Sequence, residues 1–106
     1  MKGGTLWICG LSVKLIVMDE ELWYQGSRQY GITNKWTHEI TVSTAGVCED
    51  KVIAAIYHEV NHWSFDTQRN GYPDDEEECC SCLETPWVTF TRDKRNRWFW
   101  KEVGIT

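Results

Sequence analysis

The chain has 106 residues, of which 42% are hydrophobic and 25% charged, and its formal net charge is −5 at pH 7. This composition is that of an ordinary globular domain and excludes a disordered tail or a membrane span. The length suits a single domain over residues 1–106. The acidic balance disfavours nucleic acid as a partner, because proteins that bind phosphate backbones usually carry a basic face.

The N-terminal half is predicted to be mostly sheet. Two apolar segments rich in Leu, Ile, Val and Trp, residues 5–9 and 12–18, are separated by Gly10 and predict two short strands or one bent strand. Residues 36–43 alternate in polarity and predict another strand. Lys14 interrupts the apolar N-terminal run, which is too short to span a bilayer. We therefore interpret this run as core strand.

The five cysteines are an odd number, so they cannot all pair in disulfides within the chain. Free thiols fit a reducing compartment. We therefore expect a cytoplasmic protein with no membrane association.

Residues 51–65 predict the clearest helix, because they contain no Gly or Pro and follow a turn at Gly46 and two acidic residues at 49–50. Apolar residues recur at helical spacing on one face of this segment. They are Val52, Ile56, Val60 and Trp63.

A second helix is predicted to begin within the acidic run 74–78, after breaker residues at 70–73. Its apolar positions recur at helical spacing. They are Cys79, Cys80, Leu83, Trp87 and Phe90. Because Pro86 lacks a backbone donor, we expect a kink or a break near residues 82–85. The tail, 92–103, predicts a last short helix.

The predicted first helix contains the sequence His58-Glu59-Val60-Asn61-His62, an HExxH motif. Two histidines four residues apart project from one face of a helix and can hold one metal ion. Glu59 lies beside that face, where a carboxylate can take a proton from a water activated by the metal. Two surface histidines on an ordinary helix are the alternative interpretation, but the helical context is the one that the motif requires.

A catalytic zinc site needs a third protein ligand. His38 is one candidate, although it lies in the alternating segment. Three cysteines are another, although two of them share the apolar stripe of the second helix. They are Cys79, Cys80 and Cys82. We favour a glutamate at the start of the second helix. The choices there are Glu76, Glu77 and Glu78.

Strands, an HExxH helix, a loop and a helix that bears a glutamate together resemble the minimal zincin fold, in particular the gluzincin arrangement of two histidines and one glutamate. More closely, the sequences YHEVNHW and DDEEECCSCLETPWVTFTRD are similar to small phage-encoded proteins related to ImmA/IrrE-type metallopeptidases. The resemblance implies an α+β, minimal zincin-like domain, with a short, mainly antiparallel sheet packed on the HExxH helix and a second helix that closes the site.

In that family the second helix has the form E-x-x-[AV]-x-x-[LF] and its glutamate binds the metal. On this chain the pattern begins at Glu77, with Cys80 and Leu83 at its apolar positions. Glu77 is therefore the predicted third ligand. Glu76 is the alternate, because helical phase places it closer to the face of Leu83 and Trp87.

These features predict a zinc-dependent metallopeptidase, a hydrolase of the host cytoplasm if phage-encoded, that acts on a peptide or protein. Zn²⁺ would be bound by His58, His62 and Glu77, with Glu59 as the catalytic base. The oxyanion-stabilising residue is not assigned. Its candidates are Tyr57, Tyr72 and His38.

The alternative function is a zincin-fold metal-binding interaction protein that captures a host regulator or defence protein without cleaving it. An intact Glu59 favours the enzyme, since a pure binding protein needs no general base. The small size favours the alternative, because it leaves little room for a substrate-binding subdomain. The basic, aromatic tail at 92–100 also matches single-stranded nucleic acid binding, but we favour a terminal helix packed against the sheet.

Overall fold

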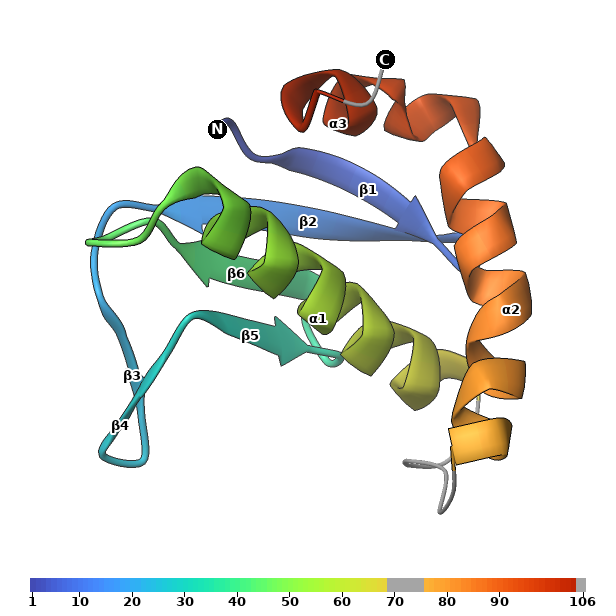
Figure 1. Cartoon of the computed structure of the whole chain (residues 1–106), viewed down its shortest axis with the longest axis horizontal. Coiled ribbons are helices and arrows are strands. Elements are labelled where there is room, and N and C mark those ends of the chain that lie inside the picture. Colours follow the sequence, from blue (N-terminus) through green and yellow to red (C-terminus); the bar gives the residue numbers. More distant parts are fainter. Residues whose placement is uncertain (69–75, 105–106) are drawn as a thin grey trace.

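A computed structural model describes residues 1–68 and 76–104, and only the backbone of residues 68, 76–82 and 84. Its elements are shown in Figure 1. The strands are β1 (Gly4–Ile8), β2 (Leu11–Met18), β3 (Leu22–Tyr24), β4 (Ser27–Gln29), β5 (Gly31–Asn34) and β6 (Glu39–Ser43). The helices are α1 (Glu49–Gln68), α2 (Glu76–Arg92), the 3-10 turn η1 (Lys94–Asn96) and α3 (Arg97–Glu102).

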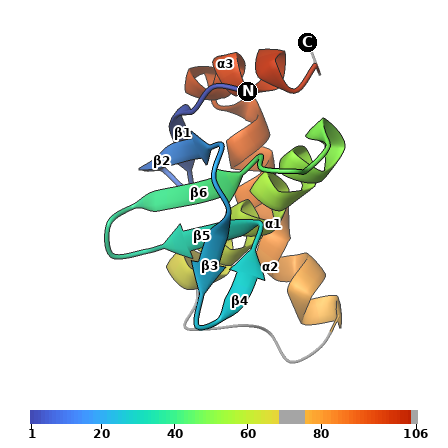
Figure 2. The ribbon, with the colours of Figure 1, turned by 90° about the vertical axis from the view of Figure 1, so that its left-hand side faces the viewer.

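The main sheet has the strand order β1-β2-β6-β5, and β3 and β4 form a separate antiparallel hairpin. β1 and β5 pair antiparallel with their neighbours, whereas the central strands β2 and β6 are parallel. Figure 2 shows the helices gathered on one face of this sheet. The fold is thus α+β, as predicted, but its sheet is mixed because the long connection from β2 to β6 lets the two strands run in the same direction.

Alternate residues of the strands form the core. Leu6, Val13 and Ile40 are fully buried and face the helices, as their register across the sheet requires. The predicted apolar face of α1 packs against them and is buried. It comprises Val52, Ile56, Val60 and Trp63. The first predicted helix is therefore confirmed, and its apolar residues, which recur every 3.6 positions, form the face that packs on the sheet.

α2 begins at Glu76, within the predicted acidic run, and continues without interruption to Arg92. The predicted break near residues 82–85 is therefore wrong, whereas the alternative of a kink there stays a prediction. Pro86 lies inside the helix. Trp87 and Phe90, directly after it, pack into the core, so burial of their rings offsets the one hydrogen bond that proline cannot donate.

The strand predicted over residues 36–43 begins only at Glu39. Residues 35–38 form a turn, in which the Asn34 side chain accepts hydrogen bonds from the backbone of Trp36 and Thr37. His38 has a φ of 56°, in the left-handed region. Alternation of polarity placed His38 in a strand, but its backbone conformation belongs to a turn.

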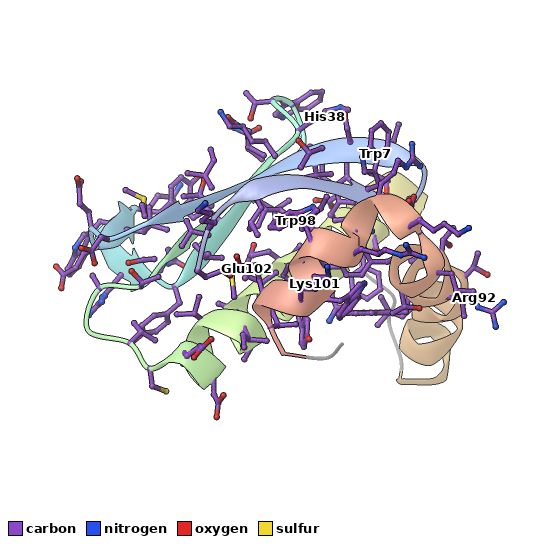
Figure 3. All side chains as sticks on the ribbon, turned by 90° about the horizontal axis from the view of Figure 1, so that it is seen from above. Trp7, His38, Arg92, Trp98, Lys101 and Glu102 are labelled. Atoms are coloured by element: carbon purple, nitrogen blue, oxygen red, sulfur yellow. The ribbon has the colours of Figure 1, made fainter. Side chains whose placement is uncertain are left out.

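The outer edge of the sheet at β1 is covered by side chains from the C-terminal segment. The Asn96 amide accepts from the Trp7 N–H at 2.8 Å and donates to the Trp7 carbonyl at 2.9 Å. The Trp98 indole donates to the Thr5 carbonyl at 2.8 Å, and Figure 3 shows Trp98 between α3 and the strands. Asn96 is fully buried and extends the hydrogen bonding of β1 as a neighbouring strand would.

The predicted last short helix is confirmed by α3, which packs against the core through Phe99, Trp98 and Trp100. Its rings thus belong to the domain interior, as the packing interpretation of the tail requires. Cys9 and Cys48 are free thiols. Within residues 1–68 and 76–104, none of the helices has the length and apolarity to cross a membrane.

Candidate metal centre

His58 and His62 lie one helical turn apart on α1, and their rings converge. Their Nε2 atoms are 3.0 Å apart and their ring centroids 4.7 Å. A tetrahedral zinc ion with Zn–N bonds of about 2.0–2.1 Å holds two imidazole nitrogens roughly 3.3 Å apart. The two side chains are therefore arranged as a pair of ligands to one ion would be.

Glu59 is buried against β5, although it is a carboxylate. Only 5% of its surface is exposed. The Thr33 hydroxyl lies 2.8 Å from its Oε1 atom, within donating distance. Ligand atoms of Glu59 and the two histidines all lie within 4.8 Å of one another. Burial of a carboxylate is costly without such a partner, so β5 fixes the position of Glu59 beside the imidazoles.

Gly31 leaves the space that the Glu59 side chain occupies. A Cβ atom on Gly31 would lie 2.9 Å from the Glu59 Cγ and 3.2 Å from its Cδ. Those distances are shorter than normal carbon–carbon contacts. The sequence alone predicts no role for Gly31 or Thr33. Neither role shows in a local pattern, because both depend on a helix 26 or more residues away.

β5 is the other outer strand of the main sheet. Because the Ser43 N–H donates to the Tyr30 carbonyl, the register with β6 directs the backbone groups of Ile32 toward β6 and those of Gly31 and Thr33 outward. Among residues 1–68 and 76–104, no backbone partner of these outward groups is found. An open strand edge therefore runs beside Glu59.

Two cavities adjoin the centre between α1 and the β4–β5 segment. One, of about 310 Å³, is lined by Tyr30, Gly31, His58 and Lys51, among others. The second, of about 220 Å³, extends past His62 on the other side. The two cavities share Gln29, Gly31 and Glu59 in their walls, and together they are called the groove.

α2 is joined to α1 at the motif. The Trp87 indole donates to the Asn61 side-chain oxygen at 2.8 Å. The predicted third ligand, Glu77, and its alternate Glu76 lie in the first turn of α2, which starts at Glu76. Their side chains, like those of Glu78 and the three clustered cysteines, lie outside the part that the structure describes. The third ligand therefore stays a prediction.

His38, a candidate both for the third ligand and for stabilising the oxyanion, lies apart from the histidine pair. The His38 ring contacts Trp63, with a centroid distance of 5.1 Å, and its Nδ1 atom lies 3.3 Å from the Ser12 carbonyl oxygen. Figure 3 shows His38 on the far side of the strands from α3. Among the described residues, the group that could hold a metal ion contains His58, Glu59 and His62 without His38.

Tyr57 packs in an aromatic cluster with residues of α2 and α3. Its ring centroid is 5.6 Å from that of Trp87 and 6.4 Å from that of Phe99. Burial raises the pKa of the Tyr57 hydroxyl above its ordinary value. This environment identifies Tyr57 as a packing residue between helices. Tyr72 lies outside the described residues, so the oxyanion-stabilising residue remains unassigned.

Comparison of the chain with protein families, with curated proteins and with solved structures finds no match.

Proposed function

We propose that this protein is a zinc-dependent metallopeptidase with a minimal zincin-like fold. His58 and His62 bind the metal, and a glutamate of α2, Glu77 or its alternate Glu76, completes the ligand set. The observation that carries the proposal is the convergence of two imidazoles beside a buried carboxylate at an open strand edge. Two imidazoles and a carboxylate suit zinc well.

When bound, zinc polarises a carbonyl group and lowers the pKa of water to about 7. Glu59 accepts the proton of the attacking water and passes it to the amine that leaves. The Thr33 hydroxyl and the close contact with Gly31 hold the Glu59 carboxylate in the position from which it does so. No reorganisation of this base is then needed when substrate arrives.

The edge of β5 provides a place for the substrate backbone. An extended peptide gains affinity by adding main-chain hydrogen bonds to an exposed strand edge. The outward groups of Gly31 and Thr33 lie next to the residues that hold Glu59. A peptide paired with them would pass directly over the histidines, which is the geometry that hydrolysis of a main-chain amide requires.

A metal-binding interaction protein is the second candidate function. Two exposed aromatic residues of the β3–β4 hairpin favour it, because Trp23 and Tyr24 are 60% and 58% exposed. Tyr24 also lines the cavity next to His62. Exposed tyrosine and tryptophan are enriched where proteins bind one another. In this candidate function the same groove captures a host regulator or defence protein and releases it intact.

A cleavage assay separates the two functions. The zinc-loaded protein is incubated with a mixture of unstructured peptides, and the fragments are identified by mass spectrometry. The peptidase predicts new termini in the wild type and none above background in Glu59→Gln, with folding and zinc content equal in both. Glu49→Gln, the same change at an exposed position in the first turn of α1, should retain cleavage. Intact peptides with the zinc-loaded wild type would overturn the peptidase.

A further inference from the structure

The face of α1 that borders the groove carries charges of opposite sign at its two ends. Lys51 precedes His58 by seven residues, which is two turns and about 10.5 Å along the helix. Asp66 follows His62 by four residues, or one turn. Both charged residues line cavities that also contain groups of the candidate centre. The groove is therefore electrostatically asymmetric about the histidines.

Lys51 lies at the wall of the larger cavity. Its ammonium group is 5.0 Å from the centroid of the Tyr30 ring, and Ala54 and Ala55 leave room beside it. Among the side chains that the structure describes, no carboxylate forms an ion pair with Lys51. A cation without an anionic partner at the wall of a cavity attracts a carboxylate ligand.

The neighbouring cation is already paired. Arg28 also lies over the Tyr30 ring, at 5.3 Å, but its guanidinium contacts Glu21 at 3.4 Å and donates to the Ala45 carbonyl. These contacts use its charge and both of its terminal nitrogens within the domain. Lys51 is therefore the cation of this cavity that is available to a substrate.

The cavity at the other end has the opposite character. Asp66 shares it with His62, Thr33 and Tyr24, and it has no ion pair with a described lysine or arginine. A negatively charged side chain placed there would meet a like charge, which disfavours it. Glu59 lines both cavities, so the difference in charge between them comes from Lys51 and Asp66. Such a difference would attract an acidic side chain at one end and repel it at the other.

We propose that the groove selects peptides by charge, with an acidic side chain entering the cavity at Lys51 and a basic or neutral side chain lying near Asp66. This inference rests on the proposed peptidase function, whose scissile bond would lie between the two cavities. The substrate class is an extended peptide in which an acidic residue lies close to the cleaved bond on one side only.

The cleavage arm uses matched ten-residue peptides that carry a single Glu, Gln or Lys at their centre. We expect the wild type to cleave the Glu peptide about tenfold faster than the Lys peptide at low salt, since an exposed charge pair changes binding by up to about fivefold and repulsion adds to it. Lys51→Glu should reverse the order. Lys94→Glu, the same charge change in η1 at the β1 edge, should leave it unchanged.

A binding arm keeps the test independent of catalysis. The same peptides, labelled with fluorescein, are titrated into zinc-loaded Glu59→Gln and into that variant with Lys51→Glu. A preference for Glu over Lys that the second change reverses supports the charge selection even if the wild type cleaves nothing, and that lack of cleavage would overturn the peptidase alone. Cleavage or binding with no charge preference, or a preference that survives Lys51→Glu, would overturn the charge selection alone.

Discussion

The two outer strands of the sheet differ in the hydrogen bonding of their outward backbone groups. At β1, the outward N–H and carbonyl of Trp7 are bonded by the Asn96 side chain, and the outward carbonyl of Thr5 is bonded by the Trp98 indole. At β5, the outward groups of Gly31 and Thr33 have no backbone partner among residues 1–68 and 76–104. An open strand edge favours aggregation. Because the β1 edge is covered, we infer that the open β5 edge is kept for a function.

We infer that the β1 edge serves the stability of the fold and that the β5 edge serves the proposed function. The covered edge depends on the side-chain amide of Asn96, which lies 89 residues from Trp7 along the chain. Asn96 is fully buried, and its amide is hydrogen-bonded to the backbone of Trp7. The open edge lies beside a buried carboxylate and two converging imidazoles. Changes at β1 should therefore lower stability and leave the candidate centre unaffected, whereas changes at β5 should displace Glu59 with little loss of stability.

The largest effect is expected for Asn96→Ala at the covered edge. The change leaves the N–H and carbonyl of Trp7 and the carbonyl of Phe90 without their Asn96 bonds. At about 1 kcal/mol or more for each buried unsatisfied group, the free energy of unfolding should fall by about 3–4 kcal/mol. Urea unfolding measures it. The exposed neighbour Lys94→Ala should change it by less than about 0.5 kcal/mol, and an equal loss there would contradict the edge account.

A smaller effect, on activity, is expected for Gly31→Ala at the open edge. The new Cβ atom would lie 2.9 Å from the Glu59 Cγ and displace the side chain. Misplacement of a catalytic group by about 1 Å costs roughly a hundredfold in rate. We expect a loss of that size in kcat/KM for peptide cleavage, with unchanged zinc content. Full activity would mean that Glu59 is not held by this contact.

Thr33→Val should have a milder effect at the same edge. It removes the hydroxyl that lies 2.8 Å from the Glu59 carboxylate while it keeps the shape of the side chain. We expect about a tenfold loss of kcat/KM, because the Glu59 carboxylate loses the hydrogen bond that orients it as a base. Thr33→Ser keeps the hydroxyl and is the matched control. If Ser and Val variants lose activity equally, packing rather than the hydrogen bond is responsible.

The smallest effect is a pH dependence of stability at the covered edge. Hydrogen bonds from the Arg95 side chain and backbone, with the Arg95 charge, hold the pKa of Asp93 below its ordinary value. A depressed pKa in the folded state contributes stability above the unfolded value of about 3.9, and this is lost as pH falls through the folded value.

The stability difference between wild type and Asp93→Asn should therefore shrink between about pH 5 and about pH 2. The pair is partly exposed, so solvent screening keeps this contribution below about 1 kcal/mol. Urea unfolding at several pH values measures it. A difference that grows toward low pH would contradict the assigned role of Arg95.

The parts of the fold that the sequence predicts are those governed by local periodicity. The apolar face of α1 and the HExxH spacing both follow from 3.6 residues per turn, and the structure confirms that helix and its buried face. The hairpin strands β3 and β4 were missed, because each has three residues and too few alternations to show a period.

The remaining features depend on contacts that no local pattern contains. His38 was placed in a strand because alternation does not report the sign of φ. Asn96 and Gly31 are an ordinary polar residue and an ordinary loop glycine in the sequence. Their roles arise only when distant segments meet. The charges at residues 51 and 66 share a helical face with the motif, so the sequence contains them, but the groove also needs the β4–β5 segment as its other wall.

The central claim is that the two imidazoles bind zinc, and elemental analysis of the purified protein tests it most directly. The wild type and Glu59→Gln should each contain close to one zinc per chain, and His58→Ala should contain almost none. Glu77→Gln and Glu76→Gln in the same series would identify the third ligand by which of them lowers the zinc content. A folded wild type that neither contains zinc nor takes it up when supplied would contradict the account.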